Sequence, residues 1–233
     1  QFPRLLEEHD GLLDLKKFGG DVWYPPGHGD LYSCLADQGY LDRLIADGRE
    51  ILFVSNVDNL GAVVDLRVLH YMVSEDIPFL MEVSPKTAAD TKGGTLYQEK
   101  GRIKLLEVAN VPPEHIVEFC GQQKFKIFNT NNIWINLVRL KELLEEGPLD
   151  LDVIVNRKMV KGQSVLQLET AVGTAFNCFP GAVGLIVPRD RFFAVKRTSD
   201  LLYLWSDLFR LARGSFKRNP ERINPDLPRI TLH

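Results

Sequence analysis

The sequence predicts a mixed, mainly parallel α/β sheet, and three observations support this fold class. Short apolar runs that suit buried strands alternate along the chain with segments of helical periodicity. A single hairpin signal interrupts this alternation, and the sequence has no internal repeat. The composition agrees, because 45% hydrophobic and 25% charged residues are ordinary for a globular protein of 233 residues.

Local signals place the predicted elements in order. Asp30 can cap a helix that Gly39 splits in two and Gly48 ends. The nearly all-apolar run 51–54 is typical of a strand buried on both faces, and a helix follows around 65–74. The later predictions are strands at 79–83, 96–98 and 102–108 (the last two a hairpin), a helix at 112–119, strands at 125–128 and 133–135, a helix at 137–146, strands at 151–155 and 165–168, a helix at 170–179, strands at 183–187 and 191–195, and a long helix at 201–213.

Charge and cysteine content exclude several classes of protein. The net charge of −3 gives no general attraction to nucleic acid. The three cysteines lie far apart and without zinc-ligand spacing, which favours a reducing compartment such as the cytoplasm. The uncharged stretch 170–188 approaches the length of a membrane span. Asn177, Pro180, Gly181 and Gly184 interrupt it, so we interpret it as part of a soluble protein and expect no membrane partner.

Three polar clusters follow predicted strands, where ligands bind in sheets of this class. Asp58, in the cluster 55–59, is suited to hold a divalent cation against phosphate oxygens, although a simple turn is the commoner explanation. The cluster 129–132 offers amides that suit sugar hydroxyls, or an asparagine-rich turn. Lys196 precedes a predicted helix and could reach a phosphate, or be one more solvated lysine.

Two glycine-containing loops add candidates. The loop 27–29 lies just before a predicted helix, and its glycines would let backbone amides approach a base or phosphate. His28 within it could donate to a ligand oxygen, although a surface histidine needs no such role. The loop 92–95 could act similarly or only turn the chain.

Six blocks of sequence together resemble a known family, the eukaryotic-type UDP-glucose pyrophosphorylases, or UTP–glucose-1-phosphate uridylyltransferases. The blocks are residues 23–30, 53–61, 92–96, 124–134, 167–173 and 191–202, in family order across nearly the whole chain. The resemblance implies a Rossmann-like fold of the nucleotide-diphospho-sugar transferase type. It also implies that UTP and glucose 1-phosphate are the substrates, UDP-glucose and pyrophosphate the products, and Mg²⁺ the cofactor.

The resemblance also assigns roles to single residues. It implies that Asp58 and Lys196 are catalytic, with Asp58 holding Mg²⁺ and Lys196 neutralising phosphate charge. Both would contact the nucleotide. The other implied contacts are Gly27 with the nucleotide and His28, Asn56, Val57, Gly94, Glu107 and Asn131 with the sugar phosphate.

The resemblance further implies a domain organisation. We expect residues 1–214 to be part of a catalytic domain without the family's glycine-rich nucleotide loop. We expect the proline-rich residues 215–233 to be a linker toward a C-terminal β-helix domain. On this hypothesis the chain alone turns over UTP poorly or not at all. A pyrophosphorylase for another UDP-sugar, such as a UDP-N-acetylhexosamine, a non-catalytic sugar-nucleotide-binding remnant, and homo-oligomerisation of the full-length enzyme all stay open.

Overall fold

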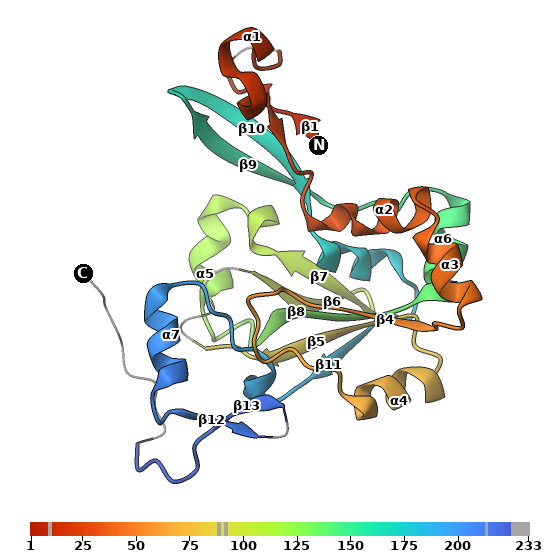
Figure 1. Cartoon of the computed structure of the whole chain (residues 1–233), viewed down its shortest axis with the longest axis vertical. Helices are drawn as coiled ribbons and strands as arrows, with labels where there is room; N and C mark the ends of the chain where they lie inside the picture. Colours follow the sequence, from red (N-terminus) through yellow and green to blue (C-terminus); the bar gives the residue numbers. More distant parts are fainter. Residues whose placement is uncertain (9–10, 88–89, 91–92, 213, 225–233) are drawn as a thin grey trace.

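A four-stranded sheet forms the centre of the computed structural model (Figure 1). Its strands, in spatial order, are β11 (Val183–Ile186), β5 (Phe79–Pro85), β8 (Ile127–Asn136) and β4 (Ile51–Val54). β11 pairs with β5 in parallel, whereas β8 runs antiparallel to both β5 and β4. The α/β class is confirmed, but the prediction of a mainly parallel sheet is wrong. Apolar runs show where strands lie, but they do not show in which direction each strand runs through the sheet.

The structure describes residues 1–8, 11–87, 90, 93–212 and 214–224.

Helices cover both faces of this sheet. On one face, β5 and β8 pack against α2 (Leu31–Asp37), α3 (Tyr40–Ala46) and α6 (Leu137–Glu146). On the other face, Leu80 and Trp134 pack against α4 (Leu66–Ser74). Side chains alternate between the faces of a strand, so Glu82 lies on the same side as Leu80. Within the described residues β4 pairs with β8 alone. Its two faces pack against the two core clusters, as predicted, but the side chains of this strand are only half-buried.

β8 is one continuous strand and not the two strands predicted around the asparagine run. The pairing of β5 with β8 shifts register between Met81 and Val83, so that several residues of β8 lie opposite Glu82. Asn131, within this bulge, has the left-handed φ of 57° that asparagine tolerates. A bulge lets a strand re-aim side chains without ending, so the asparagines are part of the sheet.

The predicted hairpin is confirmed as β6 (Gly94–Glu99) and β7 (Arg102–Glu107). The segment 170–179, which was predicted to be a helix, differs from expectation. Thr170 is the last residue of a strand, and a 3₁₀ helix, η5 (Val172–Cys178), follows it. Among the described residues no helix is both long enough and apolar enough to cross a membrane.

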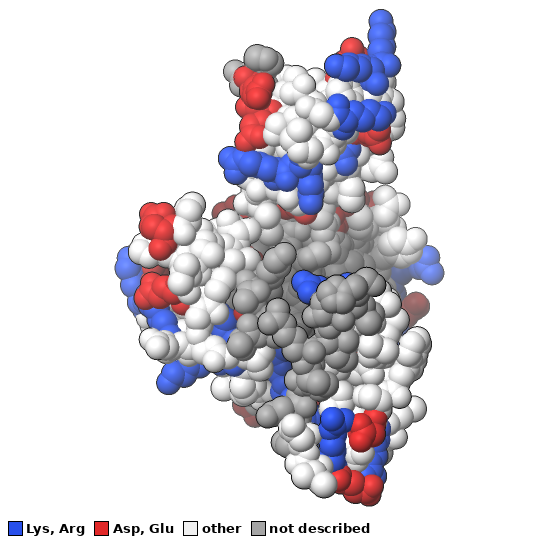
Figure 2. All heavy atoms as spheres, turned by 90° about the vertical axis from the view of Figure 1, so that its left-hand side faces the viewer, with Lys and Arg blue, Asp and Glu red and all other residues white. Residues whose placement is uncertain are grey.

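A smaller lobe protrudes at one end of the molecule (Figure 1). It contains the hairpin β9 (Val153–Val160) and β10 (Gln163–Thr170), which pairs with β2 (Leu5–Leu6) and packs against α1 (Leu15–Phe18). Figure 2 shows basic and acidic side chains interspersed on this lobe. One exposed ion pair of the lobe joins Lys161 to Asp21 at 2.8 Å.

The C-terminal part departs most from the prediction. α7 (Thr198–Trp205) ends well before 213, and β12 (Phe209–Ala212) pairs with β13 (Ser215–Arg218). Phe209 and Phe216 of this hairpin pack against Phe193, a distant contact that periodicity does not reveal. The segment predicted as a linker therefore begins with a strand, and its residues 225–233 lie outside the described residues, as does Arg213.

The segment 191–195 is not a strand of any sheet. It follows a 3₁₀ turn, η6 (Arg189–Arg191), and makes one isolated bridge, between Ala194 and Asn59. The remaining short elements are β1 (Phe2–Pro3), η1 (Gly19–Val22), β3 (Trp23–Tyr24), η2 (His28–Asp30), η3 (Val108–Asn110), η4 (Pro113–His115) and α5 (Ile116–Cys120).

Candidate functional site

The structure brings together two candidates that lie 138 residues apart, Asp58 and Lys196. Lys196 Nζ lies 2.9 Å from Asp58 Oδ2, and the two side chains are 62% and 33% exposed. The N–H of Val195 also donates to the backbone oxygen of Asp58, at 2.9 Å. The loop after β4 and the segment before α7 therefore meet along both backbone and side chains, and they present a lysine to solvent.

Backbone N–H groups at the start of α7 already donate hydrogen bonds to a side chain of the same helix. The N–H groups of Lys196 and Arg197 donate to Asp200 Oδ2 at 2.7 and 2.8 Å. These two amides at the helix start therefore already have a partner and do not assist Lys196 in binding a phosphate. The ammonium group of Lys196 remains accessible.

The same loop carries the other two candidates that follow β4. Val57 is 98% exposed, and Asn56 is half-buried, with its backbone oxygen accepting from the N–H of Asn59. The loop thus places both residues beside Asp58, and Val57 is open to a ligand.

A second group forms where the β8 bulge meets the β6–β7 hairpin. Asn131 Oδ1 accepts from Asn129 Nδ2 at 2.9 Å, and the same nitrogen lies 3.4 Å from Glu107 Oε1. Gly94 pairs with Glu107, and a Cβ on Gly94 would lie 2.7 Å from Glu107 Oε1. Burial raises the pKa of Glu107 above its ordinary value. Gly94, Glu107 and Asn131 thus belong to one polar cluster. Lys92 lies outside the described residues.

The loop containing Gly27 and His28 packs against the end of β10. The N–H of Val172 donates to His28 Nδ1 at 2.8 Å. Because Nδ1 accepts, the neutral ring carries its proton on Nε2, which becomes a donor. Burial lowers the pKa of His28, and the nearby carboxylate of Glu169 opposes this shift in part. The arrangement favours a neutral ring whose Nε2–H can donate to a ligand oxygen.

Gly27 is required by the close approach of this loop to β10. Its φ is 91°, and a Cβ there would lie 2.8 Å from Thr170 N and closer still to Thr170 O. We expect Gly27→Ala to lower the free energy of unfolding by about 1–2 kcal/mol for the left-handed backbone. The contact with Thr170 should add about 1–3 kcal/mol.

Gly48→Ala is the matched control for this prediction. Gly48 has a φ of 73° and no atom within 4 Å of the added Cβ, so its substitution carries only the conformational cost. Urea unfolding of both variants separates the cost of the left-handed backbone from the cost of the contact with Thr170. Equal losses of unfolding free energy in the two variants would show that β10 moves aside for the added methyl group.

The three groups of candidates form one continuous region. Gly173, which follows the histidine-bonded Val172, approaches Asn129, since a Cβ on Gly173 would lie 3.3 Å from Asn129 Nδ2. Farther along β8, Asn132 Oδ1 accepts from Asn59 Nδ2 at 3.0 Å, and Asn59 adjoins Asp58. β8 therefore links the glycine–histidine loop, the asparagine bulge and the Asp58–Lys196 pair.

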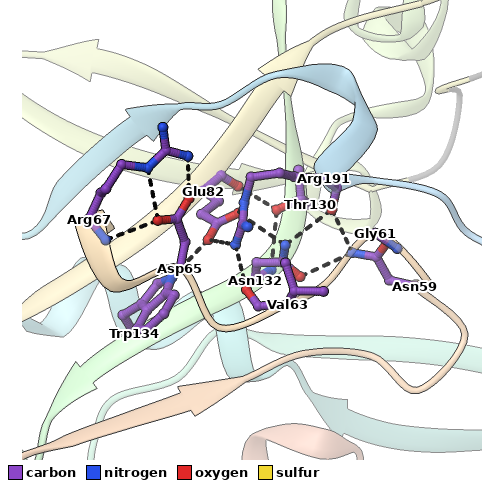
Figure 3. A network of polar contacts seen from close by, with 10 residues as sticks. All are labelled: Asn59, Gly61, Val63, Asp65, Arg67, Glu82, Thr130, Asn132, Trp134 and Arg191. Carbon is purple, nitrogen blue, oxygen red and sulfur yellow. Dashed lines mark hydrogen bonds and ion pairs between the residues drawn. The ribbon is translucent and has the colours of Figure 1, made fainter. Parts of the chain in front are cut away.

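A buried polar network behind this region was missed by the sequence reasoning (Figure 3). Glu82 is fully buried and accepts from Arg191, from Trp134 Nε1 at 2.8 Å and from Asn132 Nδ2 at 3.0 Å. A glutamate in the middle of an otherwise apolar strand was the available signal. An apolar strand carries such a charge only when a partner compensates it.

One cavity among the described residues lies away from these candidates. It has a volume of about 610 Å³ and lies between the end of α4, one face of α6 and the start of β11. It opens where β5 and β11 begin, whereas the candidates gather where β4 and β5 end. None of the candidate residues lines it, so we do not assign it to their site.

Comparison with known sequences identifies clear relatives. A sequence model of the family described as UTP–glucose-1-phosphate uridylyltransferase matches residues 1–233. An enzyme of that name from Saccharomyces cerevisiae is 54% identical over 239 aligned residues and is covered to 47% of its length. One from Pyrus pyrifolia is 51% identical over 233 residues and is covered to 50%. Each alignment includes all of this chain, and the chain spans about half the length of the curated relatives it matches.

Solved structures agree with the sequence comparison. A UDP-glucose phosphorylase from Trypanosoma brucei superposes with a TM-score of 0.84 at 39% identity, over 93% of this chain and 50% of that one. A point mutant of UDP-glucose pyrophosphorylase from Leishmania major, solved in complex with UDP-glucose, gives a TM-score of 0.84 at 39% identity. That match covers 92% of this chain and 49% of the other.

Proposed function

Because this chain belongs to the UTP–glucose-1-phosphate uridylyltransferase family, we propose that it provides the sugar-nucleotide site of an enzyme that makes UDP-glucose. The substrates are UTP and glucose 1-phosphate, and the second product is pyrophosphate. The observation that carries the proposal is the Asp58–Lys196 pair, which places an accessible ammonium beside a carboxylate next to the polar cluster of β8. The three dispersed cysteines further support a cytoplasmic enzyme.

The reaction needs positioning and charge neutralisation more than acid–base chemistry. A phosphate oxygen of glucose 1-phosphate attacks the α-phosphorus of UTP, and the bond from that phosphorus to the bridging oxygen of pyrophosphate breaks. Lys196 is exposed and paired with Asp58, so its ammonium group can exchange this partner for an incoming phosphate. We assign Lys196 to the negative charge that develops on the reacting phosphate.

Asp58 fits the role of a magnesium ligand for a metal that arrives with the triphosphate. Mg²⁺ is usually bound by one or two carboxylates together with substrate phosphates and water. Asp58 provides one such carboxylate, and the described residues hold no cluster of three acidic, histidine or cysteine side chains that would bind a metal without substrate. When bound, Mg²⁺ would supply further neutralisation of phosphate charge.

The polar cluster of β8 suits the sugar. Asn131 and Glu107 offer hydrogen-bond acceptors, and the buried Glu107 carboxyl gains most from a partner that donates, such as a glucose hydroxyl. The absence of a side chain at Gly94 keeps the space beside Glu107 open. His28 Nε2–H can donate to the sugar phosphate, and Gly27 brings the backbone of its loop close to the nucleotide.

Ligand-induced stabilisation of the chain tests this proposal. At a concentration of 100 times the dissociation constant, a ligand of the folded state adds about 2.7 kcal/mol. For a chain of this size that is a rise in Tm of about 5–11 °C. We expect UDP-glucose, and UTP with Mg²⁺, to produce such shifts, and UDP-N-acetylglucosamine to produce a smaller one. No shift with either of the first two ligands would contradict the proposal, and a larger shift with the third would favour another UDP-sugar.

A further inference from the structure

The backbone carrying Lys196 and the loop carrying Asp58 are joined by a buried junction, which we define as Asn59, Gly61, Glu82, Asn132 and Arg191 (Figure 3). Its centre is a two-pronged ion pair: Arg191 Nε donates to Glu82 Oε2 at 2.6 Å and Nη2 to Oε1 at 2.5 Å. The two side chains are 8% and 0% exposed. This pair fixes the guanidinium, and with it the η6 turn, against the centre of β5.

The backbone of Arg191 is held in place as well as its side chain. Its carbonyl oxygen accepts from Asn59 Nδ2 and from Asn132 Nδ2, both at 3.2 Å. Asn59 Oδ1 in turn accepts from the N–H of Phe193 at 2.8 Å and of Gly61 at 3.1 Å. A single buried asparagine therefore joins the loop after β4 to the chain on both sides of Phe192.

Gly61 shows how closely the two backbones approach. A Cβ at this position would lie 2.5 Å from the carbonyl oxygen of Asp190 and 2.6 Å from the carbonyl carbon of Arg191. Both neighbours are backbone atoms, which cannot rotate away as the end of a side chain could. The loop and the η6 turn thus pack without room for any larger residue.

This junction lies directly behind the Asp58–Lys196 pair. Two backbone hydrogen bonds connect it to the pair: Leu60 N–H to Phe193 O, and Val195 N–H to Asp58 O, both at 2.9 Å. We propose that Arg191 is a positioning residue, which through Glu82 and Asn59 sets the placement of Asp58 relative to Lys196. The functional part of this inference rests on the proposed uridylyltransferase activity, and its structural part does not.

The energetics of burial support a positioning role. Two buried charges lose their hydration, and an apolar pair of similar volume often stabilises a fold as well or better. An arginine–carboxylate pair instead provides fixed, planar, two-pronged geometry. A site whose two halves come from distant parts of the chain benefits from such geometry.

The same turn provides a matched comparison. Arg189 forms a similar two-pronged pair with Asp90, at 2.7 and 2.8 Å, and its side chain is 30% exposed. Its carboxylate partner belongs to the chain after β5 and not to the loop that carries Asp58. Arg189→Lys therefore removes an equivalent two-pronged pair from the same turn and leaves the contacts of the junction in place.

Hydrogen exchange of individual backbone amides tests the proposal without any ligand. Lysine keeps the charge of Arg191 but not its fork, so in Arg191→Lys the amides of Leu60 and Val195 should exchange roughly tenfold faster or more. The amides of β8 should exchange as in the unmodified protein. Asn59→Ser, which leaves no buried charge unpaired, should give the same selective increase even if Arg191→Lys folds poorly.

A second measurement connects the junction to the site. Groups that orient a metal ligand typically affect metal affinity by about 10-fold to 100-fold. The Mg²⁺ concentration needed for half-maximal stabilisation by UTP should therefore rise by about that factor in Arg191→Lys, and should stay unchanged in Arg189→Lys.

Two outcomes would overturn the positioning role. One is exchange at the unmodified rate for Leu60 and Val195 in a folded Arg191→Lys or Asn59→Ser variant. The other is an equal shift of the Mg²⁺ midpoint in Arg191→Lys and Arg189→Lys. If the unmodified chain shows no Mg²⁺-dependent binding of UTP, the proposed function fails, while the exchange result still decides whether Arg191 positions the pair.

Discussion

Replacing Lys196 by alanine should lower kcat for UDP-glucose formation by about 10²–10³, the usual effect of removing one group that stabilises transition-state charge. The ammonium group is accessible and adjoins Asp58, so its loss removes positive charge where the reacting phosphate is expected to bind. Steady-state rates of pyrophosphate release, measured on a catalytically active form of the protein, provide the measurement.

Lys161→Ala is the matched control for this substitution. Lys161 also pairs with an aspartate, at 2.8 Å from Asp21, with 59% exposure of its side chain, but it lies on the protruding lobe. We expect kcat in this variant to stay at the unmodified value. An unchanged kcat in Lys196→Ala would remove Lys196 from the mechanism.

Glu82→Gln should destabilise the fold strongly, although the two side chains have nearly the same shape. The substitution leaves Arg191 buried without a counter-charge, and breaking a buried pair in this way costs about 3–5 kcal/mol. The new amide N–H groups would also face donors from Arg191, Asn132 or Trp134. Thermal unfolding should show a fall in Tm of about 6–20 °C.

The control for Glu82→Gln is the same substitution at an exposed position. Glu142 pairs with Arg139 at 3.1 Å and is 54% exposed, so Glu142→Gln should change stability by less than about 0.5 kcal/mol. A similarly small effect at Glu82 would mean that water or another group compensates Arg191. The ion pair would then not hold the η6 turn in place.

Local signals in the sequence predicted several of the helix boundaries. Asp65 accepts from the N–H of Arg67 at the start of α4, and Gly39, with a φ of 67°, separates α2 from α3 as predicted. α6 spans the predicted residues and ends at Gly147. These predictions succeeded because a cap or a terminating glycine acts within a few residues of itself.

Strand direction and the C-terminal elements could not be predicted in this way. The apolar pattern located β8, but its antiparallel placement between β5 and β4 depends on how distant segments pair. The early end of α7 likewise accompanies the packing of Phe209 on Phe193, two residues that lie on opposite sides of that helix in the sequence. Such contacts leave no periodic trace in either segment.

The sequence by itself determined the α/β class, several helix ends and, through its resemblance to a family, the candidate site residues. Only the tertiary structure decided that Asp58 and Lys196 form a pair, and that Glu82 and Arg191 lie buried behind them. The physical reason is the cost of an isolated buried charge, which depends wholly on whether a partner reaches it. In this protein that partner lies 109 residues away along the chain.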